Sequence, residues 1–503
     1  MKQVNVKTPT EMAAEIPDGA TIALTGSGTL LLADDIFAAI EQRFLNEGHP
    51  CNLTLIHALG IGDGKGRGLS RFAHKGMVRR VIGGHWSWSS EMQELARNNE
   101  IEAYTFPAGV ISTLFRESGA GRPGVITKVG LETFADPEVA GGKCSDKAVE
   151  DLVERIIIDG ETWLRYKPLK VDFGIVRGSG IDKFGNLTTG NEPCDLDAFA
   201  VALVACNSGG KVFAQAREML EQPILPARLV TIPGTFVDAV TLVPEQRQSD
   251  DHVYDPAVSG EVARTGVTVR REPQAGPRGI ISARAARELK PGMTVNYGFG
   301  IPSGVSPAAD PKVVEQCWEL VEQGLHSGDL LDGPMFGAAR YPAAIISSSQ
   351  QFDFFAGGGL DIAFLGMGEA SGNGDVNVSM LGPSVVGPGG FMEISTGARK
   401  LVFCGTFETG GLRASDNNGS LVIEQAGRIP KLTEAVRHVT FNGHQAMKRG
   451  QEVLYVTERC VFRLTDEGML LEEVAPGVDI QSDILDRMQF SPIIKTPKPM
   501  PLG

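Results

Sequence analysis

The chain has 503 residues, which is too long for a single core. Of these residues 42% are hydrophobic and 21% charged, a composition that is ordinary for a globular protein. The formal net charge of −14 argues against general nucleic-acid binding, which requires a basic face. No apolar run approaches the ~18 residues of a membrane helix, the first residues lack the apolar core of a signal peptide, and the seven cysteines form no CxxC pair. We therefore predict a cytoplasmic protein of two or more domains, without a disulfide framework or a metal site.

Short apolar runs alternate with a helical pattern in the first part of the chain. Residues 34–48 have apolar side chains at helical spacing, and Gly48 is a plausible end for the helix. Buried strands ending in Gly or Pro are expected at 21–26, 52–60, 79–86 and 101–107. Alternation of this kind predicts an α/β fold with a largely parallel sheet.

The second part of the chain shows a similar alternation. A helix is predicted over 280–292, with Gly292 at its end, and the strand TVNY follows at 294–297. Further on, apolar residues at helical spacing predict an amphipathic helix over 311–324.

Three segments of the first half recur in the same order in the second half. The pairs are 171–188 with 360–377, 211–215 with 400–405, and 17–28 with 290–300. Each member of the first pair is an apolar strand with Asp at its second position, a polar loop and then Gly. The repeats predict two related open α/β domains that arose by duplication.

The boundary between these domains is predicted where apolar residues become scarce. Residues 261–279 are rich in Arg, Gly and Pro, so we expect a linker there. The predicted domains are then 1–260 and 280–503.

Several isolated motifs carry little weight. The stretch GFGIPSG at 298–304 resembles a phosphate-binding turn, but it is not GxGxxG, which disfavours a dinucleotide site. The similar 60–68 is interpreted as a flexible surface loop. His85, beside Trp86, is more typical of a core or supporting histidine than of a catalytic base.

Glu322 has two opposed interpretations. Its position at the end of the helix predicted over 311–324, close to Gly324, indicates a solvent-exposed carboxylate just before the helix ends. The alternative is a covalent nucleophile, and only matching sequence on both sides of it can favour that interpretation.

Five sequence blocks occur together and in a recognisable order. They are 83–86, 101–137, 298–305, 351–379 and 387–407. Together they resemble the class I coenzyme A transferases, most closely the single-chain type that moves CoA between short-chain acyl-CoAs and carboxylates such as acetate, propionate or acetoacetate. The resemblance covers roughly residues 10 to 480.

The resemblance implies a fold and a set of partners. It implies two CoA-transferase domains in one chain, an acyl-pocket half in 1–260 and a half carrying the catalytic Glu in 280–503. It also implies CoA as a substrate rather than a permanently bound cofactor, small carboxylates as the other substrate, and a homo-oligomer. The metabolic setting would be that of short-chain fatty acids or ketone bodies.

The resemblance also assigns roles to individual residues. VEQG at 321–324 lies upstream of FGAA at 336–339, as the family pattern requires, which makes Glu322 the nucleophile and Glu319 a poorer match. The loop containing Gly389 and Gly390 would lie against the reacting thioester. The remaining assignments are the CoA-binding Gly298, Gly300, Gly357, Gly358, Gly359 and Gly387, and the acyl-pocket residues Glu192 and Ala108.

Two departures from the family pattern leave the acyl substrate open. Relatives usually carry Gln at the position of Ala108, where the amide helps to hold the thioester oxygen. The run after the nucleophile, HSGDLLDGP at 326–334, is more acidic and bulkier than usual.

The expected reaction is ping-pong transfer of CoA through an acyl-glutamyl anhydride and a glutamyl-CoA thioester. One alternative is an acyl-CoA hydrolase in which water intercepts the same intermediates. A second alternative is a non-catalytic protein that binds CoA or a sugar phosphate on a related scaffold.

Overall fold

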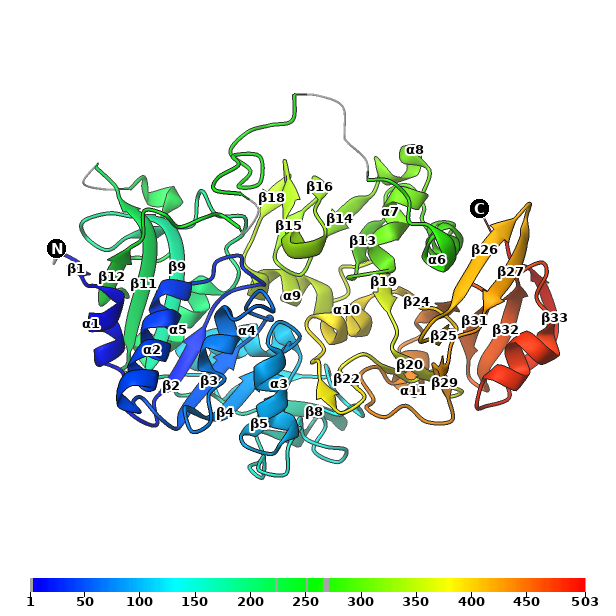
Figure 1. Ribbon diagram of the computed structural model, residues 1–503, viewed down its shortest axis with the longest axis horizontal. Coiled ribbons are helices and arrows are strands. Elements are labelled where there is room, and N and C mark those ends of the chain that lie inside the picture. The colour runs from blue at the N-terminus through cyan, green and yellow to red at the C-terminus, as the bar shows by residue number, and fades with distance from the viewer. Residues whose placement is uncertain (1–2, 222–224, 250–251, 266–270, 503) are drawn as a thin grey trace. The chain divides into compact units, whose positions relative to one another are not determined.

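The computed structural model describes residues 3–221, 225–249, 252–265 and 271–502 (Figure 1). Spatial contacts group the described residues into two compact units. The first comprises Met1–Val267, Val321–Asp353 and Gly382–Gly390, and the second comprises Thr268–Leu320, Phe354–Leu381 and Phe391–Gly503. The segment that carries Glu322 therefore groups in space with the first unit, although it follows the start of the second along the chain. The linker at 261–279 stays a prediction, and its residues 266–270 lie outside the described part.

The first unit is built on a nine-stranded sheet in the order β1-β12-β11-β9-β2-β3-β4-β5, with β10 paired to β9 (Figure 1). All of these pairings are parallel except that of β10. The strands are β1 (Asn5–Val6), β2 (Thr21–Leu24), β3 (Leu53–His57), β4 (Val78–Gly83), β5 (Glu102–Thr105), β9 (Phe173–Ile181), β10 (Leu187–Thr188), β11 (Lys211–Met219) and β12 (Ala239–Leu242). The four strands predicted at the start of the chain are confirmed as β2 to β5. Strand β9 is buried along its whole length, as expected for a parallel strand covered on both faces.

The helices of the first unit form two packed pairs and one separate helix. Helices α1 and α2 pack against each other, and so do α4 and α5, with α5 lying against β9. Their bounds are α1 (Pro9–Ala14), α2 (Asp34–Glu47), α3 (Ser90–Arg97), α4 (Ala108–Gly119) and α5 (Ala198–Asn207). Helix α2 confirms the prediction over 34–48: its apolar face is buried, and Gly48 ends it in the left-handed conformation, donating its N–H to the carbonyl of Phe44.

Shorter strands complete the first unit. An antiparallel sheet joins β6 (Val125–Thr127), β8 (Glu161–Tyr166) and β7 (Val153–Ile158). After Val321 the pairs are β15 (Leu325–His326) with β18 (Ala344–Ile345), and β16 (Asp329–Leu330) with β17 (Ala339–Arg340). Strand β23 (Ser384–Val385) lies shortly before Gly387.

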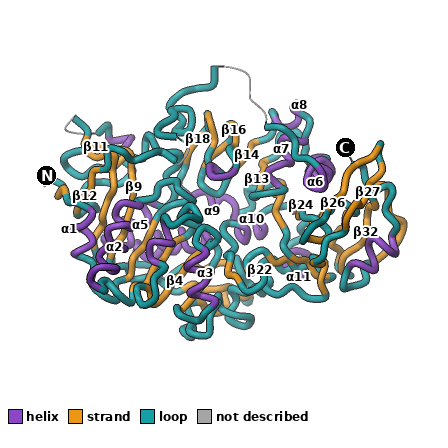
Figure 2. The backbone as a smooth tube through the Cα atoms, viewed as in Figure 1, coloured by secondary structure: helices purple, strands orange, loops and turns teal. Residues whose placement is uncertain are grey.

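The strands of the second unit's main sheet follow the order β14-β13-β19-β24-β30-β31-β32-β33. Figure 2 draws strands in orange and labels β13, β14, β24 and β32 among them. The first five strands pair in parallel. Strand β31 pairs antiparallel with both β30 and β32, and β33 pairs in parallel with β32. The bounds are β13 (Thr294–Tyr297), β14 (Trp318–Leu320), β19 (Ile362–Gly366), β24 (Lys400–Cys404), β30 (Glu452–Val456), β31 (Cys460–Thr465), β32 (Gly468–Val474) and β33 (Ile493–Pro499).

Helices and short strand pairs surround that sheet. The helices are α6 (Gly276–Ala286), α7 (Val305–Ala308), α8 (Pro311–Val314), α10 (Phe391–Gly397) and α11 (Gly443–Lys448), and α9 (Ser348–Ala356) runs from the first unit into the second. The short strands are β20 (Glu369–Ser371), β21 (Val376–Asn377), β25 (Glu408–Thr409), β26 (Arg413–Asn417), β27 (Ser420–Gln425), β28 (Ile429–Pro430) and β29 (Leu432–Thr433). The helix predicted over 280–292 is present as α6, but it begins and ends earlier. No helix in the described ranges is both long and apolar enough to cross a bilayer.

The two units repeat one arrangement of strands, as the sequence repeats predict. The order β11-β9-β2-β3 in the first unit corresponds to β24-β19-β13-β14 in the second. The repeated Asp makes the same hydrogen bond in both units. Asp172 accepts a hydrogen bond from the backbone N–H of Thr21 at 2.8 Å, and Asp361 accepts one from that of Thr294 at 2.9 Å. Each carboxylate thus ties the start of one central strand to the start of its neighbour, which confirms two related α/β domains.

The prediction of a helix over 311–324 is wrong. Helix α8 covers only Pro311–Val314, and the chain then enters β14, whose residues pair in parallel with β13. The amide of Asn296 also donates to the carbonyl of Leu320 at 2.9 Å, fixing the end of this strand. Pairing with a distant strand overrides the local helical spacing, and it places Glu322 in a turn.

Candidate active site

Glu322 lies in a tight turn between β14 and β15. The N–H of Gly324 donates to the carbonyl of Val321 at 3.0 Å, so Glu322 and Gln323 are the two central residues of the turn. Gly324 has a φ of +95°, and a Cβ there would lie 1.9 Å from the carbonyl oxygen of Ile346. Only glycine fits, which is the physical reason for the last residue of the VEQG motif.

The Glu322 carboxylate is held by two donors from different parts of the chain. The backbone N–H of Gly390 donates to Oε2 at 2.8 Å, and the side-chain amide of Gln323 donates to Oε1 at 3.4 Å. Burial raises the pKa of Glu322 to about 6, and the two hydrogen bonds act in the opposite direction. The residue is half-buried rather than exposed, so it combines a poorly solvated carboxylate with some access from outside.

The segment before Gly390 is fixed by backbone hydrogen bonds to residues that follow β4 and to the first residue of α4. The N–H of Gly389 donates to the carbonyl of Gly84 at 2.8 Å, and Gly389 accepts from the N–H of Ala108 at 2.9 Å. Trp86 donates its backbone N–H to the carbonyl of Val386 at 2.8 Å. These bonds join residues about 300 positions apart in the chain and hold the Gly390 N–H against Glu322.

Gly390 leaves no room for a side chain. A Cβ on this residue would lie 2.3 Å from Glu322 Oε2 and 2.6 Å from a ring carbon of Phe352. The close approach of backbone to carboxylate therefore depends on glycine at this position.

Comparison with known proteins finds relatives over almost the whole length of the chain. A sequence profile described as Coenzyme A transferase matches residues 6–242. The chain is 39% identical over 493 residues to a caffeate CoA-transferase from Acetobacterium woodii, covering 96% of this chain and 94% of that protein. The chain belongs to the coenzyme A transferase family.

Further relatives extend this result to structure. Acetate CoA-transferase YdiF from Escherichia coli K12 is 36% identical over 503 residues, covering 98% of this chain and 94% of that protein. The apoenzyme crystal structure of the acyl-CoA transferase YdiF from E. coli O157:H7 matches with a TM-score of 0.93 at 35% identity and the same coverage. A thioester complex of that enzyme with CoA also matches with a TM-score of 0.93. The present chain is thus an enzyme with CoA-transferase activity.

The residues predicted for the site of this CoA-transferase fall into three groups. Glu322, Gly389 and Gly390 are brought together. Ala108 is fully buried at the start of α4, and it joins the group through its backbone N–H rather than its methyl side chain. Gly387, with a φ of +78°, supports the segment, because a Cβ there would lie 2.6 Å from the Gly84 carbonyl oxygen.

Glu192 occupies a different environment. It is 3% exposed, and its carboxylate accepts hydrogen bonds from Nε and Nη2 of Arg177, at 3.2 and 3.0 Å, and from the Gln246 amide at 3.0 Å. These bonds satisfy the charge inside the protein and account for burying it. Its acyl-pocket role stays a prediction.

Gly387 belongs to the first unit, whereas the other glycines predicted to bind CoA lie in the second unit. Gly298 follows β13 and donates its N–H to the carbonyl of Phe364 at 2.8 Å. Gly300, with a φ of +89°, accepts a hydrogen bond from Gln274 at 2.9 Å. Residues 357–359 form the turn after α9, in which Gly358 has a φ of +91°. Both glycine-rich turns are ordered, and their contact with CoA stays a prediction.

The histidines next to the Gly389 segment are neutral at pH 7. Burial lowers the pKa of His85 to about 4, helped by the nearby His57, and burial also lowers that of His57 to about 4. A carbon of the His85 ring lies 3.9 Å from the position a Cβ on Gly389 would take. The structure thus favours a supporting role for His85 over that of a catalytic base.

The loop at 60–68 is more closely attached than a flexible surface loop. Gly28 donates its N–H to the carbonyl of Gly60 at 2.7 Å, and Gly62 donates to the carbonyl of Gly28 at 2.9 Å. At its far end, the N–H of Gly68 donates to the Asp34 carboxylate at 2.8 Å. The loop is therefore fastened beside the turn that follows β2.

Sequence reasoning missed the neighbours that shape the Glu322 turn. Gln323 is 2% exposed and donates to the hydroxyl of Ser27 at 3.1 Å. A Cβ on Gly337 would lie 2.2 Å from the Gln323 side chain, which explains the glycine of the FGAA block. The only feature of the sequence that could have indicated a role for Gln323 is its position next to Glu322, because the residues that it contacts are remote in sequence.

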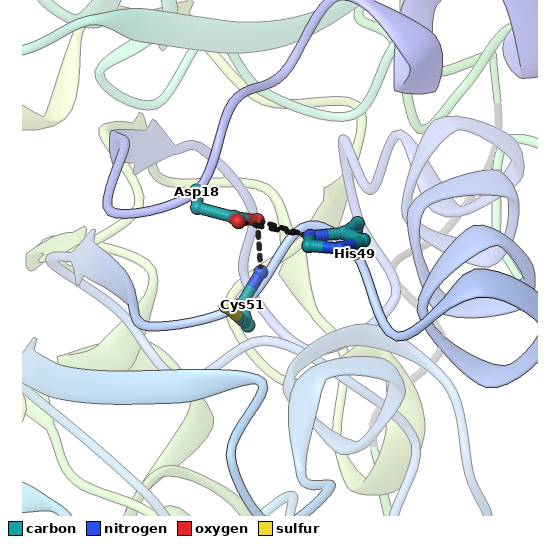
Figure 3. Close-up of side chains that lie close together, drawn as sticks. All are labelled: Asp18, His49 and Cys51. Carbon is teal, nitrogen blue, oxygen red and sulfur yellow. Dashed lines mark hydrogen bonds and ion pairs between the residues drawn. The ribbon is translucent and has the colours of Figure 1, made fainter.

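One exposed group has the residue types of a metal site. Ligand atoms of Asp18, His49 and Cys51 lie within 4.8 Å of one another. Figure 3 shows that Asp18 is bonded to the His49 ring and to the backbone nitrogen of Cys51 rather than its sulfur, at 2.8 Å in each case. Burial and the Asp18 charge raise the pKa of the Cys51 thiol, which disfavours a thiolate ligand. A hydrogen-bonded clasp between two loops accounts for the arrangement.

Proposed function

We propose that this enzyme transfers CoA from a short-chain acyl-CoA to a free carboxylate by ping-pong catalysis on Glu322. The observation that carries the proposal is the Glu322 carboxylate, poorly solvated yet accessible, with the Gly390 N–H 2.8 Å from Oε2. A thioester carbonyl is a good electrophile, and a desolvated carboxylate is a better nucleophile than one in water.

The first half-reaction loads CoA onto the enzyme. One oxygen of ionised Glu322 attacks the acyl carbonyl carbon, the carbon–sulfur bond breaks, and CoA leaves as the thiolate, giving a mixed anhydride. The thiolate then attacks the carboxyl carbon (Cδ) of Glu322, the bond from that carbon to the bridging oxygen breaks, and the first carboxylate leaves. The product is a glutamyl-CoA thioester. No net proton transfer is required.

The second half-reaction reverses these bonds with a different acid. The acceptor carboxylate attacks the Cδ of Glu322 and expels the CoA thiolate, and the thiolate then attacks the acceptor carbonyl of the new anhydride. A new acyl-CoA leaves, and the Glu322 carboxylate is restored. Each attack places negative charge on a carbonyl oxygen, so N–H donors at Glu322 stabilise the transition states.

The names of the two relatives set the range of acids worth testing. One is a caffeate and the other an acetate CoA-transferase, at similar identity to this chain. We propose acetate, propionate, butyrate and acetoacetate as acceptors from acetyl-CoA, with caffeate as the competing outcome. A homo-oligomer also stays a prediction.

The decisive experiment traps the covalent intermediate. Enzyme incubated with acetyl-CoA and quenched with borohydride or hydroxylamine should carry a modification on Glu322, detected by peptide mass spectrometry. An active enzyme whose Glu322 peptide is unmodified would exclude the proposal. Thioester loss at full rate without any added carboxylate would instead identify the hydrolase alternative.

The pKa of Glu322 predicts an acid limit to activity. The nucleophile must be ionised, and its pKa is raised to about 6, so activity should be lost as the pH falls through about 6 and be full above about pH 7. An ordinary exposed glutamate would place this limit near pH 4.3. The measurement is kcat/KM for acetyl-CoA from pH 4.5 to 8. A profile flat down to pH 5 would contradict the desolvated carboxylate.

A further inference from the structure

Only one of the two glycine N–H groups expected at the nucleophile points toward it. The N–H of Gly390 donates to Glu322 Oε2, whereas the N–H of Gly389 donates to the carbonyl of Gly84 at 2.8 Å. The donor that reaches the other carboxylate oxygen, Oε1, is the side-chain amide of Gln323, at 3.4 Å. The two oxygens of Glu322 therefore have different donors.

The Gln323 amide is built into the protein rather than free to turn. The residue is 2% exposed, and its amide nitrogen also donates to the Ser27 hydroxyl at 3.1 Å. Its side chain lies in the space that Gly337 leaves open. Since the amide nitrogen carries two hydrogens, it can serve Ser27 and Glu322 together.

The orientation of this amide has a chemical cause. In the opposite orientation the amide oxygen would face the Glu322 carboxylate, and the two acceptors would repel each other. In the observed orientation the amide oxygen of Gln323 is buried, and among the described residues it finds no hydrogen-bond partner. Leaving a buried acceptor without a partner destabilises the folded state. The protein thus keeps a donor at Glu322 at a cost to its own stability.

We infer that Gln323 is the oxyanion donor for the glutamyl carbonyl, an inference that rests on the proposed covalent mechanism. Oε2, on the Gly390 side, forms the bond to the acyl carbon, and Oε1 stays the carbonyl oxygen of the anhydride and of the glutamyl-CoA thioester. When a thiolate or carboxylate adds to Cδ, the carboxyl carbon of Glu322, the electron pair of that carbonyl moves onto Oε1. The Gln323 amide stabilises this charge, and the charge returns to the carbonyl as the leaving group departs.

The long contact in the free enzyme agrees with this role. A donor for an oxyanion is aimed at the charge of the transition state, and such bonds are often long before substrate binds. At 3.4 Å the amide is within reach of Oε1 without binding the resting carboxylate tightly.

The test is Gln323→Met, which keeps the shape of the side chain and removes the donor. We expect kcat to fall on the order of 10²-fold, as for other single oxyanion donors, with KM for acetyl-CoA within about twofold of wild type. Because the amide bond lowers the pKa of Glu322, its loss should also move the acid limb of kcat/KM to higher pH. A purely structural role would not move that limb.

Gln351→Met is the matched control. Gln351 is fully buried in the same unit, and its side chain meets the His326 ring at 2.8 Å. If the two methionine variants have equal kcat values and unshifted acid limbs, the inference is overturned. Should Gln323→Met fail to fold, Ser27→Ala removes the anchor of the amide. It should lower kcat and shift the limb in the same direction, and an unchanged profile would overturn the inference.

Trapping on wild type separates this inference from the proposed function. If wild-type Glu322 is not modified by acetyl-CoA, the covalent mechanism fails, and the inference fails with it. If Glu322 is modified and Gln323→Met has the rate and pH profile of wild type, the covalent mechanism stands and only the assignment of Gln323 fails.

Discussion

Replacing Glu322 by Gln should lower kcat for CoA transfer by at least about 10⁴-fold, the scale seen when a nucleophile is removed. The amide has nearly the same shape, but it cannot form the anhydride. The measurement is the initial rate of acyl-CoA formation from acetyl-CoA and a carboxylate, together with trapping by mass spectrometry, which should detect no intermediate.

The variant should not lose stability. Burial raises the pKa of Glu322 from an ordinary value near 4.5 to about 6, so the folded state binds the proton more tightly than the unfolded state. Between these values stability falls as the pH rises, and the ionised side chain destabilises the fold by up to about 2 kcal/mol at neutral pH. Gln carries no charge, so the thermal midpoint should be equal to or above that of wild type. Loss of activity with an intact midpoint then reports chemistry.

Glu319→Gln is the control for this substitution. Glu319 is on β14, three residues before Glu322, and accepts a hydrogen bond from the Ser306 hydroxyl at 2.9 Å. Its replacement should leave kcat within a few-fold of wild type. If Glu319→Gln is inactive and Glu322→Gln is active, the nucleophile is assigned to the wrong carboxylate.

Gly390→Ala should have the second largest effect, lowering kcat on the order of 10³-fold, because it displaces the nucleophile as well as removing one preorganised donor. The new Cβ would lie 2.3 Å from Oε2, so the carboxylate and the donor must separate. The backbone φ of Gly390 is not in the left-handed region. The effect therefore comes from the overlap and not from backbone strain.

Gly366→Ala provides the comparison. Gly366 is at the end of β19, also outside the left-handed region, and a Cβ there meets nothing within 4 Å. Its alanine variant should keep wild-type activity. A Gly390→Ala enzyme that retains more than a tenth of wild-type kcat would show that the contact between Gly390 and Glu322 is dispensable.

The fold was largely readable from the sequence because its signals are local. Helix α2 follows from apolar spacing with Gly48 at its end, and β2 to β5 follow from short buried runs. The repeated Asp172 and Asp361 marked the duplication correctly, because each performs the same bond at the start of a central strand.

The errors at the site have one cause, which is long-range pairing. The spacing in 311–324 predicts a helix as long as β13 is ignored, and the three-residue pairing of β13 with β14 removes it. Gly389 and Gly390 look equivalent in sequence, yet Gly84 accepts the N–H of one and leaves the other for Glu322. Gln323 carries no sequence signal, because Ser27 is 296 positions away.

The sequence by itself determined the fold class and the duplication, since local spacing and recurring segments carry that information, and its resemblance to a known family singled out Glu322 as the candidate nucleophile. Only the tertiary structure decided what the carboxylate experiences. Its burial and its donors come from segments near residues 27, 84 and 390 that meet only when the chain is folded. The raised pKa of Glu322 and the positions of the donors at its two oxygens therefore arise only from the contacts between these segments in the folded chain.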